Sequence, residues 1–502
     1  MMTCVDALAE VSDQSGASLP ARAGRDRLAA GLALAAFAVL CIMALSFAPK
    51  LVEPDDYAYR ASIVAMSEGH FLTLSTAQVD ALASRLSGPV GGGRPGGPRV
   101  LAGSGGLLGG PTVIPQWVQL PHGRWISEKD PGYPFLAAPF QALGVIRLAP
   151  LFYGALGCLG LYAGAKRWLG RWGGAAAVAL FCSSGAAMLF AWRDYMPTFT
   201  DASLIAAGTG ALLWAVLAAE APRMRRTGAG LAGFVALEAA TFVRYTDVVV
   251  LGCAAVAVIA AGRVRAVRLP GAALAWWLGS VAVFGAGVAV FDALVYGGPL
   301  KSGYQPGEIT FNLSAVAPNL RSMPAHLIEA MPMLVLGLAG LGWIVARWAR
   351  LRRASGEDAT HARTDLAVGL ALTASWFSVW GLYAAYTWTA HGGSTLQVVR
   401  FYVPALGAIA LLGTWFLVRL GTLLATVSAT RARRAPLALT SAALVVVLFA
   451  LGAWSFSAMR DFTIGGAKVV PGGRGPGLRQ GVVSSALPDP AAGEGGTLGQ
   501  GS

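Results

Sequence analysis

The sequence predicts an all-α polytopic membrane protein of about eleven transmembrane helices with a long first extracytoplasmic loop. Its 502 residues are 55% hydrophobic and only 13% charged, with a mean hydropathy of +0.59, whereas soluble chains carry about a quarter charged residues. Apolar runs of about 20 residues, long enough to cross a bilayer core, recur from residue 28 to residue 457. These observations exclude a soluble enzyme, a coiled coil, a secreted disulfide scaffold and an outer-membrane barrel, whose strands alternate polar and apolar residues.

The predicted spans follow one another along most of the chain. The first, residues 28–48, comes after three closely spaced arginines and is long for the apolar segment of a cleaved signal peptide, so it is interpreted as a membrane span. Ten further spans are predicted at 147–165, 173–191, 202–219, 228–243, 245–262, 270–291, 327–346, 365–388, 399–418 and 437–457. The runs 228–243 and 245–262 are short and nearly continuous, and one long kinked helix is the alternative to two short ones.

Basic residues decide between these alternatives, because the cytoplasmic turns of membrane proteins carry an excess of Lys and Arg. With eleven spans and a cytoplasmic N-terminus, a short basic cluster lies at every inner turn. The clusters are Arg22/Arg25/Arg27, Lys166/Arg167/Arg171, Arg223/Arg225/Arg226, Arg263/Arg265/Arg268, Arg347/Arg350/Arg352/Arg353/Arg363 and Arg419/Arg431/Arg433/Arg434. A single crossing over 228–262 would move the later clusters outside, so two short helices or a re-entrant-like hairpin are expected there. The same clusters explain the net charge of +13 without a nucleic-acid partner.

The organisation that follows has three parts. Residues 1–27 form a cytoplasmic tail, residues 28–457 form the transmembrane domain, and residues 458–502 form an extracytoplasmic Gly/Pro-rich tail whose composition predicts disorder. The longest outer loop, residues 49–131, contains a predicted interfacial helix near 57–70 and a flexible Gly/Pro tract at 88–111. Four of the five Cys residues lie in apolar runs, so nothing predicts a disulfide framework.

Acidic residues outside the tails lie almost entirely at predicted membrane boundaries, with Glu238 as the clearest exception. This distribution argues against an ion relay through the bilayer, which needs ionisable groups inside the spans, and favours chemistry at the outer interface. The sharpest feature is the pair Asp55 and Asp56, directly after the first span. Without other charged residues nearby, the simplest interpretation of the pair is two solvated acids in a loop. Five basic residues from separate segments map near the same boundary and form a pattern suited to a phosphorylated lipid: Lys129, Arg193, Arg244, Lys301 and Arg400.

Five segments carry a family resemblance through their order along the chain. They are Glu53-Pro54-Asp55-Asp56-Tyr57, Lys129-Asp130-Pro131-Gly132-Tyr133-Pro134, Asp201 after Arg193-Asp194-Tyr195, Arg244-Tyr245-Thr246, and Gly298-Pro299-Leu300 through Tyr304. Over residues 28–420 the chain resembles the GT-C superfamily of membrane glycosyltransferases, which includes protein mannosyltransferases, aminoarabinose transferases and galacturonosyltransferase-like enzymes. It departs from that family in two ways. Asp130 interrupts the family's Lys-Pro-Pro segment, and a short tail stands where many members carry a folded domain.

The resemblance implies an enzyme of the cytoplasmic membrane. It would move a sugar from a polyprenyl-phosphate donor to an envelope glycan, lipid or protein, by inverting single displacement at the outer face. It further implies Asp55 as general base with Asp56 positioning it, although their roles could be exchanged. Lys129 and Arg244 are expected to neutralise the departing phosphate. The remaining residues expected to bind substrate are Asp201, Lys301, Arg400, Arg193, Tyr304 and His391.

Several alternatives stay open at the level of sequence. No cofactor is required, but Asp55, Asp56 and Asp201 could hold a divalent cation. Trp117, Trp125 and Tyr133 could stack on a sugar ring, although an aromatic belt at the membrane interface is the simpler interpretation. A transporter or lipid flippase would need discontinuous helices around a midplane site, and a non-catalytic partner in envelope assembly would make the Asp pair dispensable.

Overall fold

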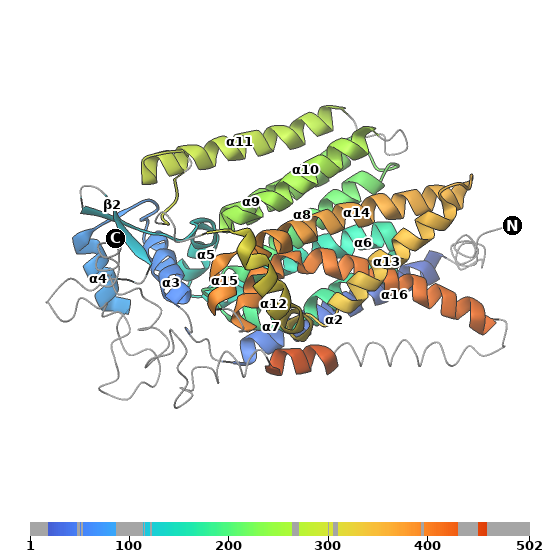
Figure 1. Ribbon diagram of the computed structural model, residues 1–502, viewed down its shortest axis with the longest axis horizontal. Helices are drawn as coiled ribbons and strands as arrows, with labels where there is room; N and C mark the ends of the chain where they lie inside the picture. The colour runs from blue at the N-terminus through green and yellow to red at the C-terminus, as the bar shows by residue number, and fades with distance from the viewer. Residues whose placement is uncertain are drawn as a thin grey trace, which may run out of the picture.

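The fold is a bundle of long apolar helices with a small subdomain of two helices and a three-stranded sheet at one end (Figure 1). The computed structural model describes residues 19–47, 51, 54–86, 114, 116–120, 123–263, 271–299, 301–304, 310–392, 396–429 and 450–458. Within these residues, eight helices are long and apolar enough to cross a membrane. The chain is therefore a polytopic α-helical membrane protein, as its composition predicts. The number of eleven spans stays a prediction. The Gly/Pro tract at 88–111 and the tail beyond residue 458 lie outside the described residues.

The helices of the bundle are largely apolar. Their bounds are α2 (Leu19–Ser46), α5 (Gly132–Ala142), α6 (Ala149–Cys182), α7 (Gly185–Trp192), α8 (Thr198–Leu217), α9 (Arg223–Val243), α10 (Val248–Arg263), α11 (Gly271–Tyr296), α12 (Val316–Ala330), α13 (Leu334–Leu351), α14 (Glu357–Ala384), α15 (Thr387–Gly392) and α16 (Leu406–Ala429). Glu238 of α9 is an acid inside a helix, where it accepts a hydrogen bond from Ser280 of α11 at 2.8 Å. Among the eight candidate spans, α16 and α8 are the most buried, with 72% and 67% of their apolar windows buried, and α11 is the least buried, with 11%. We infer that α8 and α16 form the centre of the bundle and that α11 faces lipid.

Helix α6 contains a reversal of the chain. A straight helix would separate Cys158 and Cys182 by about 36 Å, from a rise of about 1.5 Å per residue. Instead, their sulfur atoms lie 3.6 Å apart. The turn falls at Gly170, whose φ of 80° and ψ of 178° are not helical, a conformation that a residue without a Cβ adopts at little cost. The first arm of α6 therefore corresponds to the run predicted at 147–165. The run predicted at 173–191 is divided between the second arm, which ends at Cys182, and α7, because Ser184 between them is extended.

The doubtful pair of short runs forms two helices rather than one kinked helix. Helix α9 ends at Val243, Arg244 is extended, and a 3-10 turn, η4 (Tyr245–Asp247), leads into α10. The two helices pack against each other (Figure 1). This arrangement confirms the interpretation as two short helices, and it places Arg244 at a break in the backbone.

The small subdomain contains more structure than the single interfacial helix that the sequence predicts. Helix α3 (Pro54–Ser67) covers much of the predicted interfacial helix, and α4 (Thr76–Leu86) packs beside it. Three short antiparallel strands in the order β1-β3-β2 complete the subdomain: β1 (Leu74–Ser75), β2 (Trp117–Leu120) and β3 (Arg124–Ser127). Strands of two to four residues are too short for an alternating pattern to stand out in the sequence.

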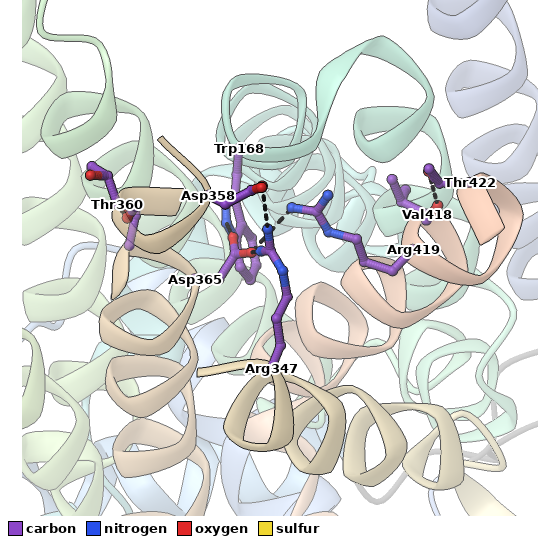
Figure 2. Close-up of polar contacts among 9 residues, drawn as sticks. Trp168, Arg347, Asp358, Thr360, Asp365, Val418, Arg419 and Thr422 are labelled. Atoms are coloured by element: carbon purple, nitrogen blue, oxygen red, sulfur yellow. Dashed lines mark hydrogen bonds and ion pairs between the residues drawn. The ribbon is translucent and has the colours of Figure 1, made fainter. Parts of the chain in front are cut away.

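The other end of the bundle is held together by a buried acid. Figure 2 shows the guanidinium groups of Arg347 and Arg419 converging on Asp365 of α14. The nitrogen-to-oxygen distances are 2.7 Å and 3.1 Å, and the indole Nε1 of Trp168 donates to the other carboxylate oxygen at 2.9 Å. These contacts join α6, α13, α14 and α16, so Asp365 holds four helices together.

Further ion pairs gather at this end, which we call the basic end. Asp26 of α2 lies 3.7 Å from Lys166 and 3.4 Å from Arg171, and Arg167 lies 2.6 Å from Glu220. Among the described residues, members of three predicted basic clusters, Lys166/Arg167/Arg171, Arg347 and Arg419, thus lie at the end of the helices opposite α3 and the sheet (Figure 1).

Candidate active site

The predicted acidic pair opens a helix at the end of the bundle opposite the basic end. Helix α3 begins at Pro54, with Asp55 and Asp56 in its first turn. Proline suits the first helical position because its fixed φ is already helical, and carboxylates near a helix N-terminus are favoured by the helix dipole. The local sequence therefore explains why the helix starts here and why both acids are held rigidly.

Asp55 lies between two basic side chains from distant parts of the sequence. Its Oδ1 is 3.3 Å from Nζ of Lys129, and its Oδ2 is 2.9 Å from Nη2 of Arg400. All three side chains are largely buried, with 16%, 10% and 11% of their surface exposed. Burial alone would raise the pKa of the Asp55 carboxyl, but the charges of Lys129 and Arg400 outweigh it and hold that pKa well below its usual range.

Asp56 is engaged differently, in a fully buried ion pair with Arg193. The guanidinium Nη2 lies 2.5 Å from Oδ2 of Asp56, and both side chains are 1% exposed. The loop that carries Arg193 is itself anchored, because Nε of Arg147 lies 3.9 Å from the Asp194 carboxylate. Arg147 also donates to the carbonyl oxygens of Ala44, Leu45 and Phe47 at the end of α2. Asp56 thus fixes the start of α3 against the bundle.

Lys129 is positioned from two sides. It follows β3, and its ammonium lies 3.2 Å from Oε1 of Glu128 and 3.4 Å from the hydroxyl of Tyr304. Tyr304 reaches it because Gly303 packs directly on the backbone of Glu128, where an added Cβ would come within 2.3 Å of a Cα atom. Burial favours the neutral amine, but the charges of Asp55 and Glu128 hold the pKa of Lys129 above its usual range.

A second group of charges surrounds Arg244 beside this site. Nε of Arg244 lies 3.5 Å from Oδ2 of Asp201, and its Nη1 donates to the carbonyl oxygen of Arg400 at 3.3 Å. The Asp247 carboxyl lies beside that of Asp201. Arg244 therefore connects the segment of Arg400 with the first turn of α8.

Asp130 joins the two groups of charges. Its Oδ2 accepts a hydrogen bond from the backbone N–H of Tyr245 at 3.2 Å, and burial raises the pKa of its carboxyl to about 7. The contact depends on close packing of α5 on α9, because an added Cβ at Gly132 would come within 2.2 Å of the Phe242 backbone.

The structure brings most of the sequence-predicted residues into one site; Lys301 lies apart from it, and the prediction for His391 stays a prediction. The residues that meet are Asp55, Asp56, Lys129, Arg193, Asp201, Arg244, Tyr304 and Arg400. Lys301 is exposed, with its stem against Gly298, and within the described part of the chain it makes no ion pair with these acids. The backbone of His391 belongs to α15, and its side chain lies outside the described residues.

Three functional candidates were missed from sequence: Glu128, Asp130 and Asp247. Glu128 precedes the segment that begins at Lys129, Asp130 lies inside that segment without a role assigned to it, and Asp247 follows Arg244 by three residues. The signal available in the sequence was that these acids lie close to Lys129 or Arg244, and a basic side chain that is buried needs an acidic partner. It was masked because loop carboxylates are usually solvated and need no partner.

The acids do not fit a metal ion. In the part of the chain that the structure describes, no three His, Cys, Asp or Glu side chains gather closely enough to hold one. Asp55, Asp56 and Asp201 each face a basic side chain instead. The predicted cation set therefore does not form, and no step below is routed through a metal.

Comparisons with known proteins yield distant matches only. No protein-family model and no curated protein matches the chain. It is similar to the apo oligosaccharyltransferase of Archaeoglobus fulgidus at 11% identity and a TM-score of 0.46, covering 84% of this chain and 56%, just over half, of that one. It is similar to ArnT from Cupriavidus metallidurans bound to undecaprenyl phosphate at 16% identity and a TM-score of 0.46, covering 89% and 80%.

A third solved structure, the same oligosaccharyltransferase in complex with Zn and sulfate, is similar at 14% identity and a TM-score of 0.38, covering 66% of this chain and 45% of that one. At such distances no residue's role can be transferred between the proteins.

Proposed function

We propose that the chain is a glycosyltransferase of the cytoplasmic membrane, with its N-terminus inside and its C-terminus outside. It moves a sugar from a polyprenyl-phosphate donor to a hydroxyl group of an envelope glycan, lipid or protein. The observation that carries the proposal is Asp55 held between Lys129 at 3.3 Å and Arg400 at 2.9 Å, opposite the basic end. The ordered resemblance of the five segments to GT-C enzymes supports it.

The reaction assigns each group a task. Asp55 takes the proton of the acceptor hydroxyl as its oxygen bonds to the anomeric carbon of the donor sugar, a step worth about 10²–10⁴-fold in rate. The bond from that carbon to the phosphate oxygen breaks, and its electron pair leaves on the phosphate. Lys129, Arg400 and Arg244 neutralise the charge that develops there. Attack opposite the leaving group inverts the anomeric centre.

Donor binding also explains how a carboxylate with a depressed pKa becomes a base. In the described structure Lys129 and Arg400 are paired with Asp55, which weakens its hold on a proton. A donor phosphate placed between the same two cations competes for their charge, so the pKa of Asp55 rises towards its usual range. The base is therefore strengthened only when the leaving group is in place.

The test is sugar transfer from decaprenyl- and undecaprenyl-phosphate donors to extracted envelope acceptors by purified protein. A panel of donor sugars is needed because the sugar is not specified by the geometry. We expect wild-type turnover, and a loss on the order of 10²-fold in Asp55→Asn, which keeps the shape of the side chain but cannot accept the proton. Asp80→Asn on α4, remote from Lys129 and Arg400, is the matched control and should retain wild-type turnover.

Two outcomes would contradict the proposal. Turnover undiminished in Asp55→Asn would move the base to another carboxylate such as Asp201. Folded wild-type protein that binds the lipid phosphate but transfers no sugar from any donor would instead favour a lipid flippase or a non-catalytic partner in envelope assembly.

A further inference from the structure

The residue that precedes β2, Gln116, has a left-handed backbone. Its φ is 57°, and among the residues that the structure describes every other residue with a positive φ is a glycine. A residue with a Cβ disfavours this conformation, because the Cβ comes too close to the following carbonyl oxygen. Such outliers persist only where the surrounding structure fixes them, and they are concentrated at functional sites.

Contacts on both sides of Gln116 fix this conformation. Ile114 and Trp117 are buried in the core of the small subdomain, together with Ala58 of α3. The indole Nε1 of Trp117 donates to the carbonyl oxygen of Ala58 at 3.5 Å. The backbone carbonyl oxygen of Gln116 accepts a hydrogen bond from the N–H of Glu128 at 2.9 Å. The backbone of Gln116 therefore cannot relax without the loss of these contacts.

The same backbone brings Gln116 next to Lys129. In the antiparallel pair of β2 and β3, Trp117 lies opposite Ser127, and the hydrogen bond that Gln116 accepts extends the pairing by one residue. Lys129 is the next residue of the chain. The residue before β2 and the second residue after β3 thus meet at one end of the sheet, beside Asp55.

Both side chains contact the candidate base. Nζ of Lys129 lies 3.3 Å from Oδ1 of Asp55, and the side-chain amide of Gln116 is hydrogen-bonded to the same carboxylate. Burial alone would raise the pKa of Asp55, whereas the charges of Lys129 and Arg400, and then the hydrogen bond from Gln116, lower it. Because an ionised carboxylate only accepts hydrogen bonds, the amide N–H of Gln116 is the donor.

The other polar atom of the Gln116 carboxamide is unpaired. Within the described part of the chain, its Oε1 is buried and has no hydrogen-bond partner. A buried polar atom without a partner lowers the stability of the fold, as does the left-handed backbone. Gln116 therefore has two features that disfavour folding, and its distinctive contribution is one N–H directed at Asp55.

We propose that Gln116 is a positioning residue for the proposed reaction: its uncharged amide holds the carboxylate of Asp55 in place while the donor phosphate engages Lys129 and Arg400. This inference rests on the proposed function. A phosphate attracts ammonium and guanidinium groups more strongly than an uncharged amide, so Gln116 keeps its hydrogen bond to Asp55 when the two cations are drawn to the donor. It orients the carboxylate without adding a positive charge, which would weaken the base.

The first test removes the amide but keeps the length of the side chain. Gln116→Met lacks both the donated N–H and the unpaired oxygen, and it is assayed for sugar transfer with the donors and acceptors given above. The matched control is Gln119→Met, because Gln119 is an exposed glutamine of the adjoining strand β2. Three quantities are measured for each protein: kcat, the Kd for undecaprenyl phosphate and the unfolding temperature.

We expect kcat of Gln116→Met to fall about ten-fold or more, because misplacing a reacting group by about 1 Å can cost on the order of 10²-fold. Its Kd for undecaprenyl phosphate and its unfolding temperature should stay close to those of wild type, and Gln119→Met should match wild type in all three. An unchanged kcat in Gln116→Met would overturn the proposal. So would an equal weakening of lipid-phosphate binding, because Gln116 would then serve the donor rather than the base.

A second variant keeps the proposal testable if Gln116→Met does not fold. Gln116→Gly also lacks the amide, but glycine adopts the left-handed conformation without steric cost. It should unfold at a higher temperature than Gln116→Ala, which keeps the strained Cβ, and both should show the same loss of kcat. Wild-type kcat in folded Gln116→Gly would overturn the proposal, and equal unfolding temperatures would contradict the left-handed backbone on which it depends.

A third measurement does not depend on turnover. The carboxylate stretching band of Asp55 in the infrared spectrum is identified by its loss in Asp55→Asn. This band should shift in Gln116→Met, which removes a hydrogen bond to the carboxylate, and should stay in place in Gln119→Met. An unshifted band would overturn the proposal. A shifted band together with no sugar transfer in wild type would establish the contact between Gln116 and Asp55 and count against the proposed function alone.

Discussion

The guanidinium of Arg400 lies 2.9 Å from the carboxylate of Asp55, joining the turn before α16 to the first turn of α3. Arg400 belongs to the 3-10 segment η6 (Leu396–Phe401), and its guanidinium also lies 4.8 Å from the ring centroid of Phe401. The contact brings together two residues that are far apart in the sequence. It also holds the candidate base and a candidate phosphate ligand in one ion pair, so each controls the charge state of the other.

Replacing Arg400 should shift the pH dependence of the reaction. Its charge helps to hold the pKa of Asp55 below the usual range, so Arg400→Gln raises that pKa. A base is active when deprotonated, so the acid limb of the rate profile should move to higher pH. Steady-state rates from pH 4 to pH 8 measure the shift, with Arg400→Lys as the charge-retaining control. An acid limb at the same pH in both variants would contradict the coupling.

Removing Arg193 should destabilise the protein more than it alters chemistry directly. Arg193→Met takes away the guanidinium that faces the fully buried Asp56, and breaking a buried ion pair from one side costs about 3–5 kcal/mol. Unfolding in detergent should show this loss. Adding Asp56→Asn to Arg193→Met removes the buried charge and should recover part of the stability; a double variant no more stable than Arg193→Met would show that the charge is not the cause.

Asp130 should make stability fall as pH rises. Burial raises the pKa of its carboxyl to about 7 in the folded protein, against about 4 in an unfolded chain. The folded state thus binds the proton more tightly, so this contribution is fully present below about pH 4 and is lost as pH rises through about 7. Asp130→Asn can still accept the bond from Tyr245. It should therefore reduce the difference in unfolding temperature between pH 5 and pH 8, and an unchanged difference would argue against Asp130 as its source.

The reversal of α6 should be visible by cross-linking. Because the sulfur atoms of Cys158 and Cys182 lie 3.6 Å apart, mild oxidation with iodine should join them, each thiol losing a hydrogen atom as iodine is reduced to iodide. Mass spectrometry of the peptides would detect the disulfide. Cys158→Ser should abolish it and Cys41→Ser should not. Failure to form it in wild type would favour a straight helix.

Neutralising Asp365 should loosen the basic end of the bundle. Asp365→Asn leaves Arg347 and Arg419 facing each other without the carboxylate that both contact (Figure 2), so we expect a lower unfolding temperature. Asp358→Asn is a matched control, because Asp358 lies 3.8 Å from Arg347 and is 43% exposed, and exposed pairs contribute little. Equal losses in the two variants would contradict the central role of Asp365.

Much of the candidate site could be predicted from sequence because membrane burial restricts where charges lie. The ends of apolar runs carry four of its residues: Asp55, Lys129, Arg244 and Arg400. A charged side chain at such a boundary must reach water or pair with another charge, because a charge inside the bilayer is costly. The prediction could not separate Lys301 from this set, because the sequence does not show which segments pack around a lysine and therefore whether it is exposed or buried. It also gave Asp55 and Asp56 interchangeable roles.

The sequence by itself determined the polytopic helical architecture, the acidic pair that opens α3 and the presence of basic groups near it. These depend on local properties: the length of apolar runs, the charge at their ends and the residues that start a helix. Only the tertiary structure decided that Asp55 faces Lys129 and Arg400 while Asp56 faces Arg193. The physical reason is that pairing and burial are set by contacts between segments far apart in the chain, which no local pattern records.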